Sequence, residues 1–263
     1  MKRREFLAGA VLAGVLPVIR QQAPSSAGAV DPSLLQDLVA ANRILAEQGV
    51  LDAFGHVSVR HNRDPNRFLI SRSLAPALVG EEDFIEYDLD SNAVNARGRA
   101  QYSERFIHGS IYKARKDVNA VVHSHSPSVI PFGVSSVPMR PVYHMAAFNG
   151  DGLPTFDIRK AAGITDMLVS NADKGRALAQ ALADKPAVLM RGHGVAVVGP
   201  ALPYAVGRSI YLEVNARIQL QAIGLGGRVT YIDPEEAKKV LEAGENRGYE
   251  RAWELWKRKV MTK

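Results

Sequence analysis

Asn119-Ala-Val-Val-His-Ser-His-Ser-Pro127 combines a short apolar run with two histidines at its end. The run Ala120 to Val122 has the composition of a buried β-strand, and Pro127 predicts the end of that strand. Residues two apart in a strand point to the same face of the sheet, so we expect His123 and His125 side by side near the strand end. Two imidazoles in this position predict two ligands of a metal site that a substrate can reach.

A second apolar segment supplies a third candidate ligand. Ala187-Val-Leu-Met-Arg-Gly-His-Gly194 is followed by the apolar run Val195 to Val198, a pattern typical of a tight β-hairpin with His193 at its tip. The chain contains no cysteine, which excludes thiolate ligands and a closed structural site built on them. Nitrogen and oxygen ligands at an open position suit zinc, manganese, iron(II), cobalt or nickel.

The candidate carboxylate of the site is Glu104, in the segment Gln101-Tyr-Ser-Glu-Arg-Phe-Ile-His108. This segment predicts a helix start with Ser103 as the N-cap and Glu104 in the first turn. His108 follows one turn later on the same face of the helix. A packed, hydrogen-bonded core histidine is the alternative interpretation of His108.

Together these motifs resemble the class II aldolase/adducin family, over about residues 34 to 226. The early segment Gly55-His-Val-Ser-Val-Arg60 belongs to the same resemblance. The resemblance implies a three-layer α/β/α fold around a central mixed, mostly antiparallel sheet. It implies a homo-oligomer, a tetramer or a multiple of it, with the active site at a subunit boundary. It also implies one divalent metal ion per chain, with Glu104 as the catalytic acid/base and the metal ligands His123, His125 and His193.

The segments that hold phosphate in the sugar-phosphate aldolases of this family differ in this chain. Their small polar loops are replaced by Asp52-Ala-Phe-Gly-His56, Ser71-Arg-Ser-Leu-Ala-Pro76 and Gln101-Tyr-Ser103. We therefore expect His56, Ser71 and Arg72 to bind the substrate, because a guanidinium pairs well with a planar carboxylate. A surface role for Arg72 is the alternative.

Tyr143 and His144 are further candidates for substrate binding. They fall in the region where family aldolases use a tyrosine contributed by a neighbouring subunit. Packing at the subunit contact is the alternative role for both residues. The aromatic side chains Phe54, Tyr102, Phe106 and Tyr143 either line a flat pocket for an unsaturated substrate or belong to the core.

The pattern looks closest to a branch of the family that includes decarboxylases of hydroxylated aromatic or pyridine dicarboxylates. We expect a divalent-metal-dependent carbon–carbon lyase acting on a non-phosphorylated carboxylic acid. The expected reaction is decarboxylation of a hydroxylated aromatic or heteroaromatic acid through an enolate whose charge the metal stabilises. The alternatives are an aldolase acting on a small hydroxy-carbonyl compound or sugar, an iron(II) oxygenase of an aromatic acid, and a non-catalytic adducin-like module. Zinc is the first choice of metal, followed by manganese, iron(II) or cobalt.

The N-terminus resembles a twin-arginine export signal. Met1-Lys-Arg-Arg-Glu-Phe-Leu7 precedes an apolar stretch from Ala8 to Ile19, which is too short to span ~30 Å of hydrocarbon. Ala27-Gly-Ala29 fits the cleavage rule for small residues, so residues 1–29 are expected to be removed. The mature chain would then begin near Val30 and reach the bacterial periplasm already folded. A basic tail or a short membrane anchor is the alternative.

Charge and organisation set further expectations. The formal net charge of +6 falls to about +3 without residues 1–29, which gives no signature of nucleic-acid binding. We expect a small-molecule substrate, no nucleic-acid partner and no stable membrane insertion after cleavage. Residues 30–263 are expected to form a single domain with a helical extension from about residue 233. The elements expected within this domain are helices at Pro32 to Gln48, Ser103 to Lys116, Ala172 to Leu182 and Leu202 to Gly224, strands at Val57 to Arg60 and Phe68 to Ser71, and a final helix capped by Asp233.

Overall fold

The computed structural model describes residues 25–262, except for the side chains of residues 245–248. Most of the expected signal peptide, residues 1–24, lies outside the described residues. The strands are β1 (His56–Arg60), β2 (Arg67–Ser71), β3 (Phe84–Asp88), β4 (Ala120–Ser124), β5 (Thr155–Phe156), β6 (Ala187–Met190) and β7 (Gly194–Gly199). The α-helices are α1 (Pro32–Glu47), α2 (Arg105–Ala114), α3 (Ile130–Val134), α4 (Ile158–Ala162), α5 (Ala172–Leu182), α6 (Leu202–Gly224) and α7 (Pro234–Met261). Three short 3-10 helices are η1 (Pro76–Leu78), η2 (Glu81–Asp83) and η3 (His144–Asn149).

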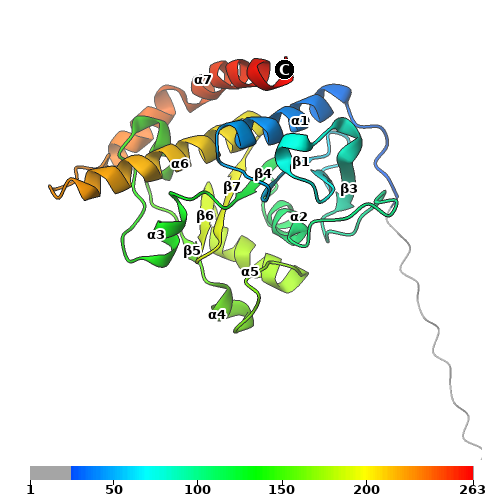
Figure 1. Ribbon diagram of the computed structural model, residues 1–263, viewed down its shortest axis with the longest axis horizontal. Coiled ribbons are helices and arrows are strands. Elements are labelled where there is room, and N and C mark those ends of the chain that lie inside the picture. Colours follow the sequence, from blue (N-terminus) through cyan, green and yellow to red (C-terminus); the bar gives the residue numbers. More distant parts are fainter. Residues whose placement is uncertain (1–24, 263) are drawn as a thin grey trace, which may run out of the picture.

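The strands form one sheet in the order β3-β2-β1-β4-β7-β6-β5. All neighbouring strands run antiparallel except β5 and β6, which are parallel. The strand that carries the two histidines, β4, lies at the centre between β1 and β7 (Figure 1). This architecture confirms the expected mixed, mostly antiparallel sheet.

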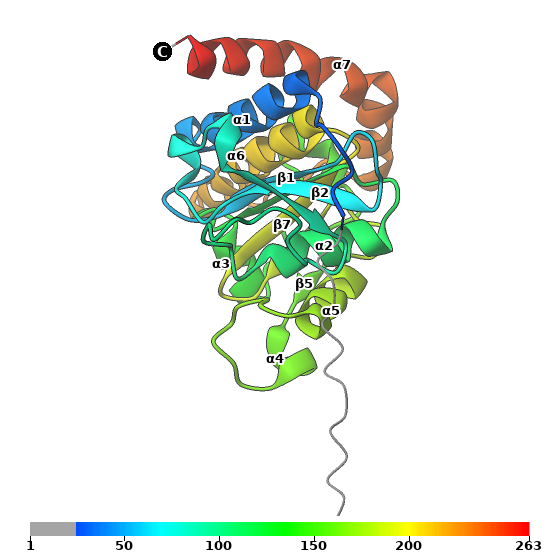
Figure 2. The same cartoon turned by 90° about the vertical axis from the view of Figure 1, so that its right-hand side faces the viewer.

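Helices cover both faces of the sheet, which confirms the three-layer α/β/α fold. Helices α1, α6 and α7 lie on one face, and α2, α4 and α5 lie on the other (Figure 2). Successive side chains of a strand pack alternately into the hydrophobic cores on the two faces of the sheet. In β4, Ala120 and Val122 pack toward α1 and α6, while Val121 packs toward α2 and α5. His123 and His125 continue the series of Val121, so they belong to the α2 face.

Helix boundaries follow the capping signals in the sequence. Asp31 caps α1 through a hydrogen bond from the Ser33 N–H, and Asn171 caps α5 in the same way through Lys174. Asp233 and Glu236 form the capping box that begins α7. Trp253 and Trp256 of α7 both pack on the core that α1 and α6 share, so the C-terminal helix covers this domain.

Three local expectations need correction. The helix after Ser103 is shorter than expected, Arg105–Ala114, and Glu104 rather than Ser103 occupies its N-cap position without a side-chain capping bond. The edge strands β3 and β5 were not expected from the sequence. Strand β3 contains the buried Glu86, whose carboxylate bonds Ser26 Oγ at 2.7 Å and the Ala27 N–H at 2.9 Å. The end of the expected signal peptide therefore contacts the sheet.

Helix α6 holds the loop that precedes η3. Asn215 accepts a hydrogen bond from Val142 N–H and donates one to the Arg140 carbonyl. Gln219, one turn later, accepts from Arg140 N–H and donates to the Pro138 carbonyl. These buried amides satisfy the backbone of an irregular segment next to the helix. Within residues 25–262, no helix has both the length and the hydropathy needed to cross a bilayer.

Candidate metal centre and substrate cavity

Strand β4 places the first two histidines at its end. His123 pairs with His56 of β1 on one side and with Ala196 of β7 on the other. The Nδ1–H of His123 donates to the Val195 carbonyl at 3.1 Å. This bond fixes the tautomer and leaves the lone pair of His123 Nε2 directed into the site. The rings of His123 and His125 lie 5.1 Å apart, as the strand period predicts.

The β6–β7 hairpin brings His193 to the same point. Its turn uses Gly192 at a φ of +65°, a conformation that favours glycine. Gly194 packs so closely on β4 that a Cβ there would lie 2.1 Å from the Ser124 carbonyl oxygen. This close approach places the His193 ring 5.0 Å from the rings of both His123 and His125.

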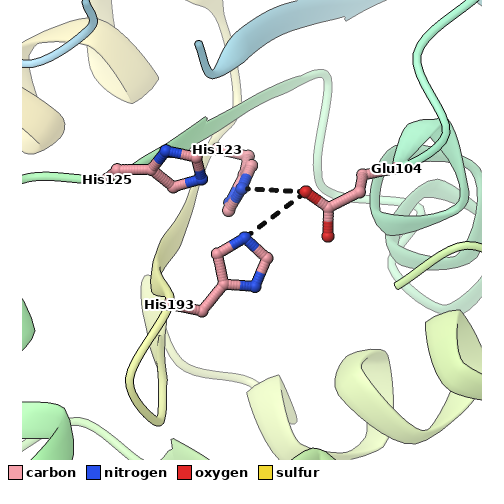
Figure 3. Close-up of side chains that lie close together, drawn as sticks. All are labelled: Glu104, His123, His125 and His193. Atoms are coloured by element: carbon pink, nitrogen blue, oxygen red, sulfur yellow. Dashed lines mark ion pairs between the residues drawn. The ribbon is translucent and has the colours of Figure 1, made fainter. Parts of the chain in front are cut away.

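Glu104 reaches the three histidines from the start of α2 (Figure 3). Its Oε2 lies 3.5 Å from His123 Nε2 and 3.4 Å from His193 Nε2. Its Oε1 accepts a hydrogen bond from the Val169 N–H at 2.9 Å. Burial by itself would raise the pKa of the Glu104 carboxyl, but the neighbouring imidazoles of His123 and His193 hold that pKa well below its usual range. Glu104 is therefore ionised.

The donor set fits a divalent metal ion. One ligand atom from each of Glu104, His123, His125 and His193 lies within 4.8 Å of all the others. His123 Nε2 and His125 Nε2 are buried and have no hydrogen-bond partner among the described residues. Unpaired buried nitrogens cost free energy unless a ligand uses their lone pairs. Burial and the neighbouring His123 lower the pKa of His125 to about 4, so its imidazole is neutral near pH 7.

A cavity of about 490 Å³ adjoins this cluster. Glu104 and His125 line it together with the aromatic groups Phe54, His56 and Tyr102. Phe54 is 65% exposed, which places an aromatic side chain within reach of an entering ligand. The remaining lining residues are Ala53, Gly55, Ser73, Leu74, Ala75, Gln101, Ser103 and Leu168. A planar ligand in this cavity would contact aromatic faces and the candidate metal ligands together.

The other predicted substrate-binding residues divide between this cavity and distant positions. Ser71 is buried and its Oγ lies 3.4 Å from the Tyr102 hydroxyl, close to the cavity lining. Arg72 is not among the lining residues, and its Nε donates to Asp83 at 2.6 Å. Tyr143 and His144 line a different cavity of about 730 Å³, between η3, α6 and α7. Within one chain, therefore, the structure brings His56 to the cluster and leaves Arg72, Tyr143 and His144 away from it.

Sequence reasoning did not foresee the buried polar chain behind His56. His56 Nδ1 lies 2.6 Å from His108 Nε2, and His108 Nδ1 lies 2.6 Å from Ser58 Oγ. Ser58 Oγ in turn lies 2.7 Å from the Tyr112 hydroxyl. Burial lowers the pKa of His108 to about 3. Burial also lowers the pKa of His56 well below its usual value, and the neighbouring His108 lowers it further. His56 and Ser58 are two residues apart in a strand, and His108 and Tyr112 are four apart in a helix. These spacings place each pair on one face of its element, and they are the signal for this series in the sequence.

Fold and site together define a three-layer α/β protein with a Glu/three-His cluster, suited to a divalent metal, between the central sheet and the start of α2. The chain belongs to the class II aldolase and adducin family, because the family model described as "Class II Aldolase and Adducin N-terminal domain" matches residues 36–220. The family predicted from the motifs around Glu104, His123, His125 and His193 is thereby confirmed. Helix α7 lies beyond the matched residues.

Known relatives of the chain include decarboxylases and aldolases. Decarboxylase tropJ of Talaromyces stipitatus is 36% identical over 250 residues, which cover 87% of this chain and 94% of the relative. The 3,4-dihydroxyphthalate decarboxylase of Arthrobacter keyseri is 29% identical, over 81% of this chain and 88% of the relative. The solved L-fuculose 1-phosphate aldolase from Glaciozyma antarctica has a TM-score of 0.72 at 25% identity, over 87% of this chain and 88% of that one.

Proposed function

We propose that this protein is a divalent-metal-dependent decarboxylase of a hydroxylated aromatic or heteroaromatic acid. The observation that carries the proposal is the cavity that joins the Glu104 and histidine cluster to the aromatic groups Phe54, His56 and Tyr102. The names of the decarboxylase relatives support the same reaction class. When bound by the three histidines, the metal would stabilise negative charge on substrate oxygen atoms.

The protein's own groups divide the remaining work. Loss of carbon dioxide leaves an electron pair on the ring carbon, and one proton must replace the carboxylate there. Glu104 Oε2 is the atom that we assign to this proton transfer, because Oε1 is already occupied by the Val169 N–H. Glu104 is ionised in the resting site, so it takes up a proton before it can donate one. The aromatic groups hold the ring and exclude water.

The aldolase alternative keeps the same cluster and changes the substrate. The similarity to L-fuculose 1-phosphate aldolase keeps this alternative open. Among the described residues, however, no lysine or arginine lines the cavity, so the phosphate of a sugar phosphate would meet no cation of the same chain. The lining therefore favours a non-phosphorylated substrate with a planar apolar part.

Elemental analysis and a gas assay on one preparation test the proposal. We expect one divalent metal per chain and release of carbon dioxide from hydroxylated aromatic di-acids without oxygen uptake. His123→Ala should lose the metal and the activity. His144→Ala is the matched control, since His144 is exposed and lies away from the cluster, and it should keep the metal.

Other results would replace the proposal. Oxygen uptake with an aromatic acid would indicate the iron(II) oxygenase, and cleavage of a sugar would indicate the aldolase. A preparation that binds no metal even after anaerobic reconstitution would leave the non-catalytic adducin-like module. The metal itself is expected to be zinc, and the same elemental analysis distinguishes it from manganese, iron and cobalt.

A further inference from the structure

We propose that His56 presents a fixed Nε2–H donor to a substrate oxygen, and that Tyr112, Ser58 and His108 are positioning residues that set this tautomer. The inference rests on the proposed function for the identity of the ligand, an aromatic acid. The assignment of the proton rests on the structure alone. It makes the cavity selective for a hydrogen-bond acceptor, such as a carboxylate or phenolate oxygen, beside the metal ligands.

The chain of hydrogen bonds is built from two elements with different periods. Strand β1 contributes His56 and Ser58, two residues apart on one face, and helix α2 contributes His108 and Tyr112, one turn apart. The three links measure 2.7 Å from Tyr112 to Ser58, 2.6 Å from Ser58 to His108 and 2.6 Å from His108 to His56. All four residues are at most 3% exposed, so the chain is sealed from solvent except at its cavity end.

Counting protons gives the chain a direction. Each link holds one proton, and a neutral His108 donates at one ring nitrogen and accepts at the other. If Ser58 donates to His108, its single hydroxyl proton is used, so Tyr112 donates to Ser58 and His108 donates to His56. If His108 instead donates to Ser58, then His56 donates to His108, and the O–H of either Tyr112 or Ser58 needs a further acceptor. Among the described residues, Ser58 Oγ bonds only His108 and Tyr112, and besides Ser58 the Tyr112 hydroxyl meets the donors Val121 N–H and Arg60. A buried donor without an acceptor carries its full desolvation cost. The favoured direction is therefore Tyr112 to Ser58 to His108 to His56.

This direction determines the state of His56. Its Nδ1 accepts the proton shared with His108, so a neutral ring carries its own hydrogen on Nε2. That nitrogen has no partner within residues 25–262, and His56 lines the cavity. A protonated Nε2 has no lone pair for a metal, although the His56 ring lies only 5.1 Å from that of His123. The hydrogen-bonded series thus makes His56 a hydrogen-bond donor, whereas the adjacent histidines are metal ligands.

The direct test is the tautomer of His56. Ring ¹⁵N NMR of the zinc-loaded full chain should show His56 neutral and protonated at Nε2, with the signal assigned by its loss in His56→Gln. A bare Nε2 or an imidazolium near neutral pH would overturn the inference. This measurement needs no substrate, so it stands even if the proposed reaction is wrong.

Variants test whether the hydrogen-bonded series of Tyr112, Ser58 and His108 sets the tautomer of His56. Ser58→Asp replaces a hydroxyl by an acceptor, which obliges both Tyr112 and His108 to donate to it. While His108 stays neutral, which its own ring ¹⁵N signals report, the His56 proton should move to Nδ1. Tyr87→Phe is the matched control, because the Tyr87 hydroxyl is buried on the same side of the sheet without a partner among the described residues. It should leave the His56 signals unchanged. A folded Ser58→Asp protein with a neutral His108 and the wild-type His56 signals would overturn the role of the hydrogen-bonded series. The wild-type spectrum decides the tautomer if that variant does not fold or if its His108 is charged.

Salicylate, as a hydroxylated aromatic acid, tests the use of the donor. His56→Leu should bind it about tenfold more weakly than wild type, whereas His56→Gln, which keeps an N–H donor, should stay within about threefold. Equal weakening in both variants would show that the ring only fills space. If wild type fails to bind salicylate while the tautomer is as inferred, the proposed substrate class is wrong and the positioning chain remains.

Discussion

At the scale of single residues, Glu104 has two functions that one substitution separates. It faces the histidines as an anion, and we assign the proton transfer to its Oε2. Glu104→Gln keeps the size and the bond from Val169 but removes the transferable proton. We expect this variant to retain the metal and to lose about 10²-fold or more in kcat. Turnover near the wild-type rate would reduce Glu104 to a residue that begins helix α2.

His108 makes a prediction about pH and stability. Burial and the charge of His123 lower its pKa from 6.5 to about 3 in the folded protein. Between these values the unfolded chain binds a proton at His108 that the folded chain does not, so the free energy of unfolding falls as the pH is lowered. For one group the slope is about 1 kcal/mol per pH unit.

Urea unfolding of the metal-free protein from about pH 7 to about pH 5 measures this slope. His108→Gln should show a shallower pH dependence than wild type. The exposed His144, replaced by glutamine, provides the control and should keep the wild-type slope. Parallel slopes in His108→Gln and wild type would show that His108 titrates normally in the fold.

At the scale of secondary-structure elements, the contact between the β6–β7 hairpin and β4 controls the third ligand. A Cβ on Gly194 would collide with the Ser124 carbonyl, so Gly194→Ala must separate the two strands at the position of His193. We expect the affinity for the metal to fall by about tenfold or more, as measured by competition with a chelator. Gly227→Ala, where a Cβ meets no atom within 4 Å, should keep the wild-type affinity. Unchanged affinity in Gly194→Ala would mean that the hairpin adapts without moving His193.

At the scale of the whole molecule, we propose that the twin-arginine segment exports the folded protein to the periplasm. Arg3→Lys combined with Arg4→Lys preserves the charge and removes the guanidinium pair, so the protein should remain in the cytoplasmic fraction of a host with twin-arginine export. Arg20→Lys lies after the apolar stretch and should be exported normally. Equal export of both proteins would remove the twin-arginine assignment. The homo-oligomer, and any role of Tyr143 or His144 in a neighbouring subunit, stay predictions.

The sequence alone determined the elements whose signals are local. The period of a strand placed His123 and His125 on one face. Capping residues marked the starts of α5 and α7. The motifs also predicted the family, because the order and spacing of Glu104, His123 and His193 are properties of the sequence itself. Strand β3 was missed because the partners of its buried central Glu86, which are Arg67, Ser26 and the Ala27 N–H, are distant in the chain.

Only the tertiary structure decided what meets at the site. Glu104 lies beside the histidines because the start of α2 packs against the end of β4. His193 lies there because Gly194, which has no side chain, lets the hairpin pack closely on Ser124. Arg72 pairs with Asp83, so its predicted contact with substrate does not follow from its position in the chain. The chain from His56 to Tyr112 joins β1 to α2 across some fifty residues of sequence. Local periodicity fixes which way a side chain points, whereas packing between distant elements fixes what it touches.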